Sequence, residues 1–253
     1  MEKYYHFYEK SYEKFLPDWF QESNLKAIDN YLKENSESLI SFIESYELQF
    51  NLPSNCFRNK KVLVLGCGLG ALSFYLESRG AFVTGLDVSK LAISQARDIG
   101  KLKRSSCEFL VRDCTKNLDL GEFDYIFDDH LLHCLALDSD REAYMSSARA
   151  ALTTEGLFFL EMMAFHGEIK IPVDYRFDED SVLWKDLGQS EIMIRKIASS
   201  IEVEKDIKKT GFFINYLYYH SELSFQVFTD YPSFPHEFLP KTISLTCKRA
   251  MTL

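Results

Sequence analysis

Hydrophobic residues follow a helical spacing through the first part of the chain. Aromatic and aliphatic side chains recur every three or four positions in residues 4–20, 25–32 and 39–46. This period predicts amphipathic helices. The polar residues 35–38 are expected to end one helix and cap the next. Residues 1–58 are therefore predicted to form an N-terminal helical cap.

The middle of the chain changes to short, continuous apolar runs that alternate with helical segments. The run at residues 62–65 is apolar throughout and stops at glycines, which is typical of a strand buried on both faces. Similar runs predict further strands at residues 81–86, 107–111, 123–127 and 156–161. Helices are predicted between them at residues 72–79, 90–99 and 141–152, the second capped by Ser89 and ended by Gly100. Because strands and helices alternate, we expect βαβ units and a parallel sheet.

The alternation lapses after residue 163. Residues 164–190 contain Gly167, Pro172 and mixed charges, which predict a loop or lid. We place this lid-like insertion at about residues 164–198, inside an α/β domain that spans residues 59–253. The expected elements beyond the insertion are a helix at 201–209 capped by Ser199 or Ser200, a strand at 212–219 and a final strand at 242–248.

A glycine-rich turn follows the first predicted strand. In Gly66-Cys67-Gly68-Leu69-Gly70, glycines let the backbone turn tightly and approach a ligand without a Cβ clash. The helix that follows offers free N–H groups to an acidic group. Such a turn could seat a nucleotide pyrophosphate or the carboxylate of a methionine tail. Ala71 completes the dinucleotide fingerprint G-x-G-x-x-A, so the turn alone leaves both ligands open.

Two carboxylates stand at the ends of the next two predicted strands. Asp87 ends the second strand, where a carboxylate can accept two hydrogen bonds from a ribose diol. Asp113 follows the third strand and can accept from the exocyclic amine of adenine. Each could instead be an Asp that caps its own turn. At this spacing they favour an adenosine ligand, which NAD would also supply.

The combined motifs resemble the Rossmann-like (class I) S-adenosylmethionine-dependent methyltransferases. The resemblance rests on residues 62–70, 85–89, 112–114 and 123–126, and it extends loosely over residues 195–250. It implies a doubly wound α/β fold with a seven-stranded, mostly parallel sheet whose last strand is antiparallel. It also implies S-adenosylmethionine as the cofactor and methyl transfer as the activity.

The resemblance assigns the cofactor-binding residues. Three glycines line the methionine part, Asp87 holds the ribose, Asp113 and Cys114 contact adenine, and Asp128 lies near the methionine amino group or the acceptor. The cofactor-binding residues predicted in this way are Gly66, Cys67, Gly68, Gly70, Asp87, Val88, Asp113, Cys114 and Asp128. The sequence departs from the family where an acidic residue is common, at Val64, and the usual Pro-Gly is missing from the turn at residues 152–156.

Candidates for acid–base chemistry follow the fourth predicted strand. His130 and His133 are three residues apart, so one helical turn would put them on one side. A histidine can take the proton of a hydroxyl or amine acceptor, and methyl transfer from a sulfonium needs no metal. We predict His133 and His130 as catalytic residues, His133 slightly ahead, and no metal site. Packed or capping histidines are the alternative.

The aromatic excess suggests a cover for the acceptor. Aromatic residues make up 15% of the chain, and many lie at the N-terminus and in the C-terminal third. A flat apolar or aromatic small molecule would suit such a cover. The lining residues expected on this basis are Tyr8, Tyr12, Trp19, Phe165, Tyr175 and Trp184.

Composition narrows the class of partner. The formal net charge is −9, and no segment carries the basic face that phosphate neutralisation requires, so a nucleic-acid substrate is disfavoured. The six cysteines are scattered without a C-x-x-C pair, which disfavours a disulfide framework or a zinc site. No signal-peptide core or long apolar run is present, so a reducing cytoplasm and no membrane contact are expected.

Two other functions remain open at this point. An NAD-dependent oxidoreductase would use the same glycine turn and Asp87. A cofactor-binding protein without catalytic activity could use the domain for protein contacts.

Overall fold

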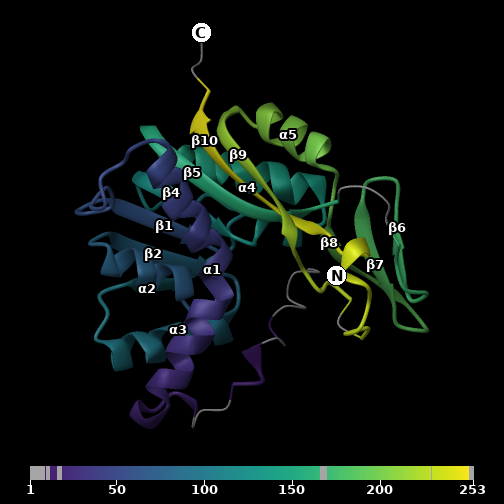
Figure 1. Ribbon diagram of the computed structural model, residues 1–253, viewed down its shortest axis with the longest axis horizontal. Coiled ribbons are helices and arrows are strands. Elements are labelled where there is room, and N and C mark those ends of the chain that lie inside the picture. Colours follow the sequence, from purple (N-terminus) through teal and green to yellow (C-terminus); the bar gives the residue numbers. More distant parts are fainter. Residues whose placement is uncertain (1–8, 10–11, 16–18, 166–169, 229, 251–253) are drawn as a thin grey trace.

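A seven-stranded sheet forms the centre of the protein (Figure 1). The computed structural model describes residues 9, 12–15, 19–165, 170–228 and 230–250. Strands run in the order β3-β2-β1-β4-β5-β10-β9, with β1 to β5 parallel to one another and β10 antiparallel to both of its neighbours. Their bounds are β1 Lys61–Leu65, β2 Phe82–Asp87, β3 Glu108–Val111, β4 Phe123–Asp129, β5 Leu152–Ala164, β9 Phe212–Ser224 and β10 Lys241–Arg249. The predicted fold class is confirmed.

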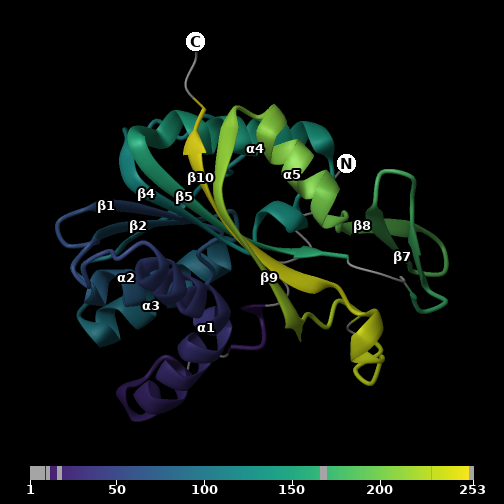
Figure 2. The ribbon, with the colours of Figure 1, turned by 45° about the horizontal axis from the view of Figure 1, so that its top comes forward.

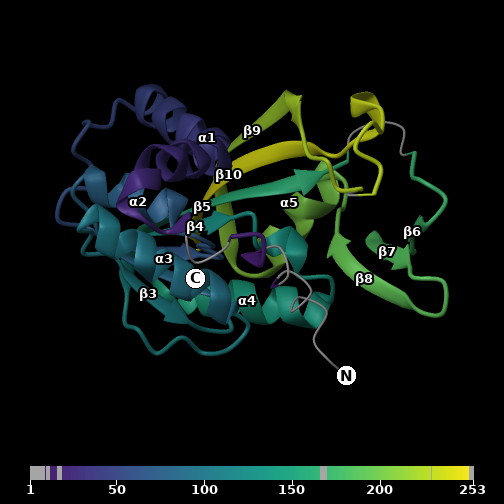
Figure 3. The ribbon, with the colours of Figure 1, turned by 90° about the horizontal axis from the view of Figure 1, so that it is seen from below.

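Helices cover both faces of this sheet. Figure 2 shows α4 and α5 above the sheet and α1, α2 and α3 below it, and Figure 3 gives the same layers from another side. The helices are α1 Leu25–Gln49, α2 Ala71–Ser78, α3 Lys90–Lys103, α4 Asp138–Ala151 and α5 Ser200–Lys209. Three short 3-10 turns are also present, η3 Glu22–Asn24, η4 Leu132–Cys134 and η5 His236–Phe238. In the described part of the chain, no helix combines the length and apolar character needed to cross a membrane.

The apolar run of β1 supplies side chains to both layers. Val62 and Val64 belong to the core beneath α1, α2 and α3, and Leu63 and Leu65 belong to the core beneath α4 and α5. All four are fully buried. A strand whose two faces are both covered must be apolar at every position, which is the pattern that the sequence displays.

One continuous helix replaces two predicted helices near the N-terminus. The expected break at residues 35–38 is wrong, because α1 runs through it. Asn35 and Ser36 bond back to the carbonyls of Tyr31 and Leu32, so their polar side chains are satisfied inside the helix. Of the remainder of the predicted cap, residues 1–8, 10–11 and 16–18 lie outside the described residues, while residues 22–24 form the short turn η3 and residues 50–58 form turns instead of helix.

Other predicted boundaries move by a few residues. The helix predicted to end at Gly100 continues to Lys103 and ends at Arg104, which has a φ of 53°. The N-caps at Ser89 and Ser199 are confirmed, since each hydroxyl accepts a hydrogen bond from a backbone N–H of the first turn. The strands β4, β5 and β9 all extend beyond their predicted ends.

Strands form part of the segment in which a loop was predicted. A separate antiparallel sheet contains β6 Tyr175–Phe177, β7 Val182–Asp186 and β8 Glu191–Lys196. It stands to one side of the main sheet, beyond the end of β5 (Figure 1). The loop prediction for residues 164–190 is therefore wrong in its secondary structure. Short strands with mixed charges gave too weak an alternation to be recognised.

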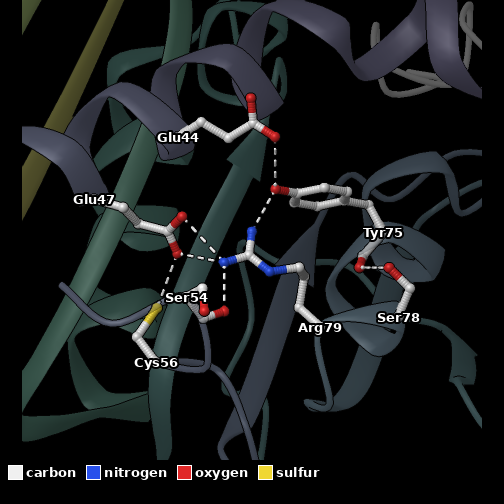
Figure 4. A network of polar contacts seen from close by, with 7 residues as sticks. All are labelled: Glu44, Glu47, Ser54, Cys56, Tyr75, Ser78 and Arg79. Atoms are coloured by element: carbon white, nitrogen blue, oxygen red, sulfur yellow. Dashed lines mark hydrogen bonds and ion pairs between the residues drawn. The ribbon is translucent and has the colours of Figure 1, made fainter.

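A polar network fastens α1 to α2 (Figure 4). The Arg79 guanidinium lies 2.8 Å from Glu47 Oε1 and also donates to the Ser54 carbonyl and to the Tyr75 hydroxyl. The thiol of Cys56 donates to the same Glu47 carboxylate at 3.0 Å. The Arg79 and Glu47 side chains are only 19% and 12% exposed. Each charge therefore depends on the other for hydrogen bonds that water cannot fully supply.

Replacing Arg79 tests this connection. We expect Arg79→Met to lower the free energy of unfolding by about 2 kcal/mol, because the Glu47 carboxylate loses its charged donor. Lys101→Met is the control, since Lys101 is 78% exposed in its ion pair and such a pair contributes less than about 1 kcal/mol. Urea unfolding measures both variants. Equal midpoints for the two would contradict the role given to Arg79.

Candidate active site

The glycine turn lies at the carboxyl end of β1 and holds an unusual backbone. Gly66 has a φ of +72° and Gly68 a φ of +49°, in the left-handed region that favours glycine. A Cβ on Gly66 would stand 2.9 Å from the Cβ of Leu131, in the loop after β4. The cofactor turn and the loop after β4 are therefore in direct contact.

Asp87 at the end of β2 is joined to the same turn. Its carboxylate accepts from the N–H of Gly68 at 3.0 Å and from the N–H of Ser89 at 2.8 Å. Burial raises the pKa of Asp87, since the side chain is only 9% exposed. The structure thus brings Asp87 and the glycine turn together, as the spacing predicted.

Tyr12 lies over the glycine turn. Its hydroxyl is 3.1 Å from the position that a Cβ of Gly68 would take. The side-chain amide of Gln95 on α3 fixes this segment by donating to the carbonyls of Tyr12 and Phe15. Burial and the nearby Asp87 carboxylate raise the pKa of the Tyr12 phenol. Tyr12 was predicted to line an acceptor pocket, and the structure places it beside the cofactor turn instead.

A small cavity of about 40 Å³ lies between the ends of β1, β2 and β3. It brings together Gly66, Asp87, Val88, Asp113 and Cys114, which the resemblance assigned to the cofactor. Its other lining residues, which were not predicted as cofactor contacts, are Arg112, Thr115, Leu131 and Leu135. Arg112 and Thr115 could have been predicted, because they flank Asp113 and Cys114 in the sequence. Leu131 and Leu135 are distant in the sequence from the other lining residues.

Some predicted cofactor residues point elsewhere. The Cys67 side chain is buried in the core beneath α2 and α3, so its backbone alone remains near the turn. Gly70 is the N-cap of α2. The Asp113 carboxylate accepts hydrogen bonds from the backbone N–H and the hydroxyl of Thr115. Asp113 therefore caps the turn in which it lies. The contact of Asp113 with adenine stays a prediction.

Asp128 shapes the loop after β4. This fully buried carboxylate accepts from the N–H groups of Leu131 and Leu132 at 2.6 and 2.9 Å and from the Tyr144 hydroxyl at 2.5 Å. Burial raises the pKa of Asp128 to about 6. In this arrangement the carboxylate is engaged by the protein, so its predicted contact with the cofactor or the acceptor stays a prediction.

His130 stands at the start of that loop in a strained conformation. Its φ is 65°, which for a residue with a Cβ costs about 1–3 kcal/mol. Its Nε2 lies 2.9 Å from Oε1 of Glu161, a fully buried residue of β5. Burial lowers the pKa of His130, but the hydrogen bond and charge of Glu161 outweigh it, so the pKa is raised overall. The Nδ1 atom is buried and has no hydrogen-bond partner within the described residues.

His133 lies one turn further along, on η4. Its ring centroid is 5.6 Å from that of His130, so the structure brings the two predicted histidines together. Burial, followed by the charges of Arg195, His130 and Arg141, lowers the pKa of His133 well below its usual value. His133 is therefore a neutral imidazole, whereas His130 is paired with a carboxylate.

A larger cavity of about 680 Å³ opens on the other side of this loop. Its lining comes from α1, the loop after β4, β5, β8, β9 and the segment that follows β9. The lining residues are Glu34, Asn35, Glu37, Ser38, Ser41, His130, His133, Cys134, Met163, Arg195, His220, Leu223 and Phe225. Most of these side chains are polar.

The loop at residues 130–135 therefore separates two cavities. Leu131 and Leu135 face the smaller one, and His130, His133 and Cys134 face the larger one. The aromatic residues predicted to cover an acceptor do not line the larger cavity. Phe165 and Tyr175 pack in a core beside the small sheet, and Trp184 donates to Asp178. Tyr8 lies outside the described residues.

No metal centre is evident in the part of the chain that the structure describes. No group of three or more His, Cys, Asp or Glu side chains there could hold a metal ion. None of the six cysteines forms a disulfide bond.

Comparison with known proteins identifies the class. Residues 57–215, more than half of the chain, match a family model described as a methyltransferase domain. The chain is also 34% identical, over 103 residues, to an uncharacterized methyltransferase of Schizosaccharomyces pombe. That match covers 40% of this chain and 70% of the relative.

Solved structures share the fold. An S-adenosylmethionine-dependent methyltransferase from Clostridium acetobutylicum superposes with a TM-score of 0.60 at 15% identity, over 83% of this chain and 90% of that one. A Pyrococcus horikoshii protein superposes with a TM-score of 0.61 at 19% identity, over 94% and 98% of the two chains.

The chain belongs to the methyltransferase domain family, and its fold is the Rossmann-like fold of class I methyltransferases. The predicted enzyme class and the predicted cofactor, S-adenosylmethionine, are thereby confirmed at the level of the family. The oxidoreductase alternative is set aside. The glycine turn, whose Gly66 leaves no room for a Cβ, and the strand-end Asp87 fit that cofactor.

Asp87 provides a direct test of the cofactor site. We expect Asp87→Asn to weaken binding of S-adenosylhomocysteine by about tenfold to a hundredfold, because an amide has one acceptor oxygen and no charge for a ribose diol. Calorimetry measures the affinity at a temperature at which both proteins are folded. The control is Asp98→Asn on the exposed side of α3, and equal affinity in the two variants would contradict the assignment.

Proposed function

We propose that this protein transfers a methyl group from S-adenosylmethionine to a polar small molecule held in the larger cavity. The observation that carries the proposal is the loop at residues 130–135, which forms a wall of both cavities. A methyl donor bound along the glycine turn, extending beyond the smaller cavity, and an acceptor in the larger cavity would meet at the edge of this loop. Alignment of the two reactants is the main contribution that an enzyme makes to such a displacement.

S-adenosylmethionine, when bound, supplies a methyl group on a positively charged sulfur. The acceptor contributes a lone pair to the new bond with the methyl carbon, and the electron pair of the broken carbon–sulfur bond stays on sulfur. The remaining proton of a hydroxyl or amine acceptor has to be removed. We assign that proton to Nδ1 of His130, which becomes an imidazolium beside the Glu161 carboxylate.

His130 suits this role better than His133. Nδ1 of His130 has no hydrogen-bond partner in the described residues, so its lone pair is not engaged by the protein, and His130 also has a carboxylate that stabilises its charged form. His133 has the same free Nδ1 but lies near Arg195 and Arg141, whose charges oppose protonation. His133 is therefore assigned to hydrogen bonding with the acceptor, which reverses the order expected from sequence.

The polar lining favours a polar acceptor over the flat apolar molecule considered from sequence. Side chains from α1 and β9 present carboxylate, hydroxyl and imidazole groups to the cavity, and its apolar part is confined to Met163, Leu223 and Phe225. A volume of about 680 Å³ suits a small molecule.

Transfer of label from methyl-labelled S-adenosylmethionine tests the function. We expect label to enter polar hydroxyl or amine compounds from a small-molecule mixture. The same assay is run with proteins and with RNA as acceptors. Label found in those macromolecules alone would contradict the proposal, and so would cofactor binding without transfer to any of the three.

His130 is tested once an acceptor is known. We expect His130→Gln to reduce kcat by about a hundredfold or more, the usual contribution of a general base, while affinity for S-adenosylhomocysteine stays unchanged. His236→Gln is the control, because His236 is exposed on η5. A kcat equal to that of the control would contradict the assignment.

A further inference from the structure

The Glu161 carboxylate is fully buried near the end of β5, and its neighbours come from the loop after β4, from α1 and from β10. Oε1 accepts from His130 Nε2 at 2.9 Å and from the hydroxyl of Ser38 on α1. Oε2 accepts from the hydroxyl of Ser244 on β10 at 2.8 Å. A carboxylate removed from water needs such donors. Both oxygens are therefore fixed in place.

The chain of hydrogen bonds continues to His220 on β9. Its Nε2 lies 2.8 Å from the Ser244 hydroxyl. Because Ser244 donates its single proton to Glu161, it accepts from His220, so His220 carries its proton on Nε2. Burial lowers the pKa of His220, which keeps this imidazole neutral. The network adds no second positive charge beside Glu161.

Glu161 also determines which nitrogen of His130 can act as a base. An ionised carboxylate only accepts hydrogen bonds, so Nε2 of His130 must carry a proton. The neutral ring then has its lone pair on Nδ1, the buried atom that lacks a partner in the described residues. The orientation of the ring is restricted further by Phe225, whose centroid is 4.7 Å away.

We propose that Glu161 is the positioning residue of this methyltransferase, which holds His130 in the Nε2–H form and so leaves the lone pair on Nδ1 to take the proton of the acceptor. Ser38 and Ser244 hold the carboxylate in turn. The inference rests on the proposed function of His130. Nothing in the sequence singled out Glu161, since it lies inside an apolar strand and is 31 residues away from His130 along the chain.

The sign of the pH dependence follows from the charge of Glu161. A base must be unprotonated, so the rate rises as the pH rises through the pKa of His130. Loss of the carboxylate charge lowers that pKa, and the acid limb of the rate profile moves to lower pH. Other charged or titratable groups near His130 are common to all variants. They are Asp128 and Asp129 on β4, His133 and Cys134 in the loop, Arg195 on β8, His220 on β9, and Glu34 and Glu37 on α1.

Nuclear magnetic resonance of ¹⁵N-labelled imidazoles tests the proposal in the cofactor-free protein, without an acceptor. The His130 signals are identified by their absence from the spectrum of His130→Gln. In the unchanged protein we expect the Nε2–H form above the pKa and a titration midpoint above the usual 6.5. A neutral His130 with its proton on Nδ1 would overturn the proposal, and this measurement needs no variant of Glu161.

Glu161→Gln gives the second measurement. We expect the His130 midpoint to fall by about one pH unit or more, because an opposite charge is lost from its immediate neighbour. Glu155→Gln, at an exposed position of the same strand, should leave the midpoint unchanged. An unchanged midpoint in Glu161→Gln would overturn the proposal. Failure of label transfer to every small molecule would instead overturn the proposed function, whatever the titration gives.

Discussion

A single buried carboxylate, Asp128, organises the part of the molecule where chemistry is expected. It stands at the end of β4 and accepts two backbone N–H groups of the following loop together with the Tyr144 hydroxyl. These bonds hold the loop in a tight turn against Gly66. The wall between the two cavities exists because this turn is tight. Without the carboxylate, buried N–H groups would be left unpaired.

The strain at His130 is explained by the same turn. A left-handed conformation is unfavourable for histidine, so surrounding bonds must compensate for it. Asp128 fixes the backbone after His130, and Glu161 fixes the ring. The result is an imidazole of fixed orientation in the wall of the larger cavity. Strain of this kind is concentrated at functional sites because positioning is what they require.

The acceptor side is built by elements distant from one another in sequence. α1 brings Ser38 to the sheet, β10 brings Ser244, and β9 brings His220. The antiparallel pairing of β10 with both β5 and β9 sets the register that aligns Ser244 with Glu161. Variation in α1 or in the small sheet of β6 to β8 could therefore change the acceptor while the cofactor turn stays the same.

The class of fold and the identity of the cofactor could be predicted from the sequence alone. The unbroken apolar run of β1 indicates burial on both faces of the strand, and the glycines directly after it indicate a tight backbone turn. Both signals are local, because each is carried by neighbouring residues. The order of strand-end carboxylates at Asp87 and Asp113 carries similar local information. The spacing of the two histidines also predicted that they lie together, whereas their catalytic role stays a prediction.

The difference between the two histidines and the lining of the larger cavity depend on contacts between residues far apart in the sequence. The contrast between His130 and His133 arises from Glu161 on one side and Arg195 on the other, and neither is a sequence neighbour. The pairing of Ser244 with Glu161 depends on the register between β10 and β5, and a short apolar strand does not specify its register by itself. Packing also explains the strands of the insertion and the unbroken helix α1. In both places it outweighs the secondary-structure preference of the local sequence.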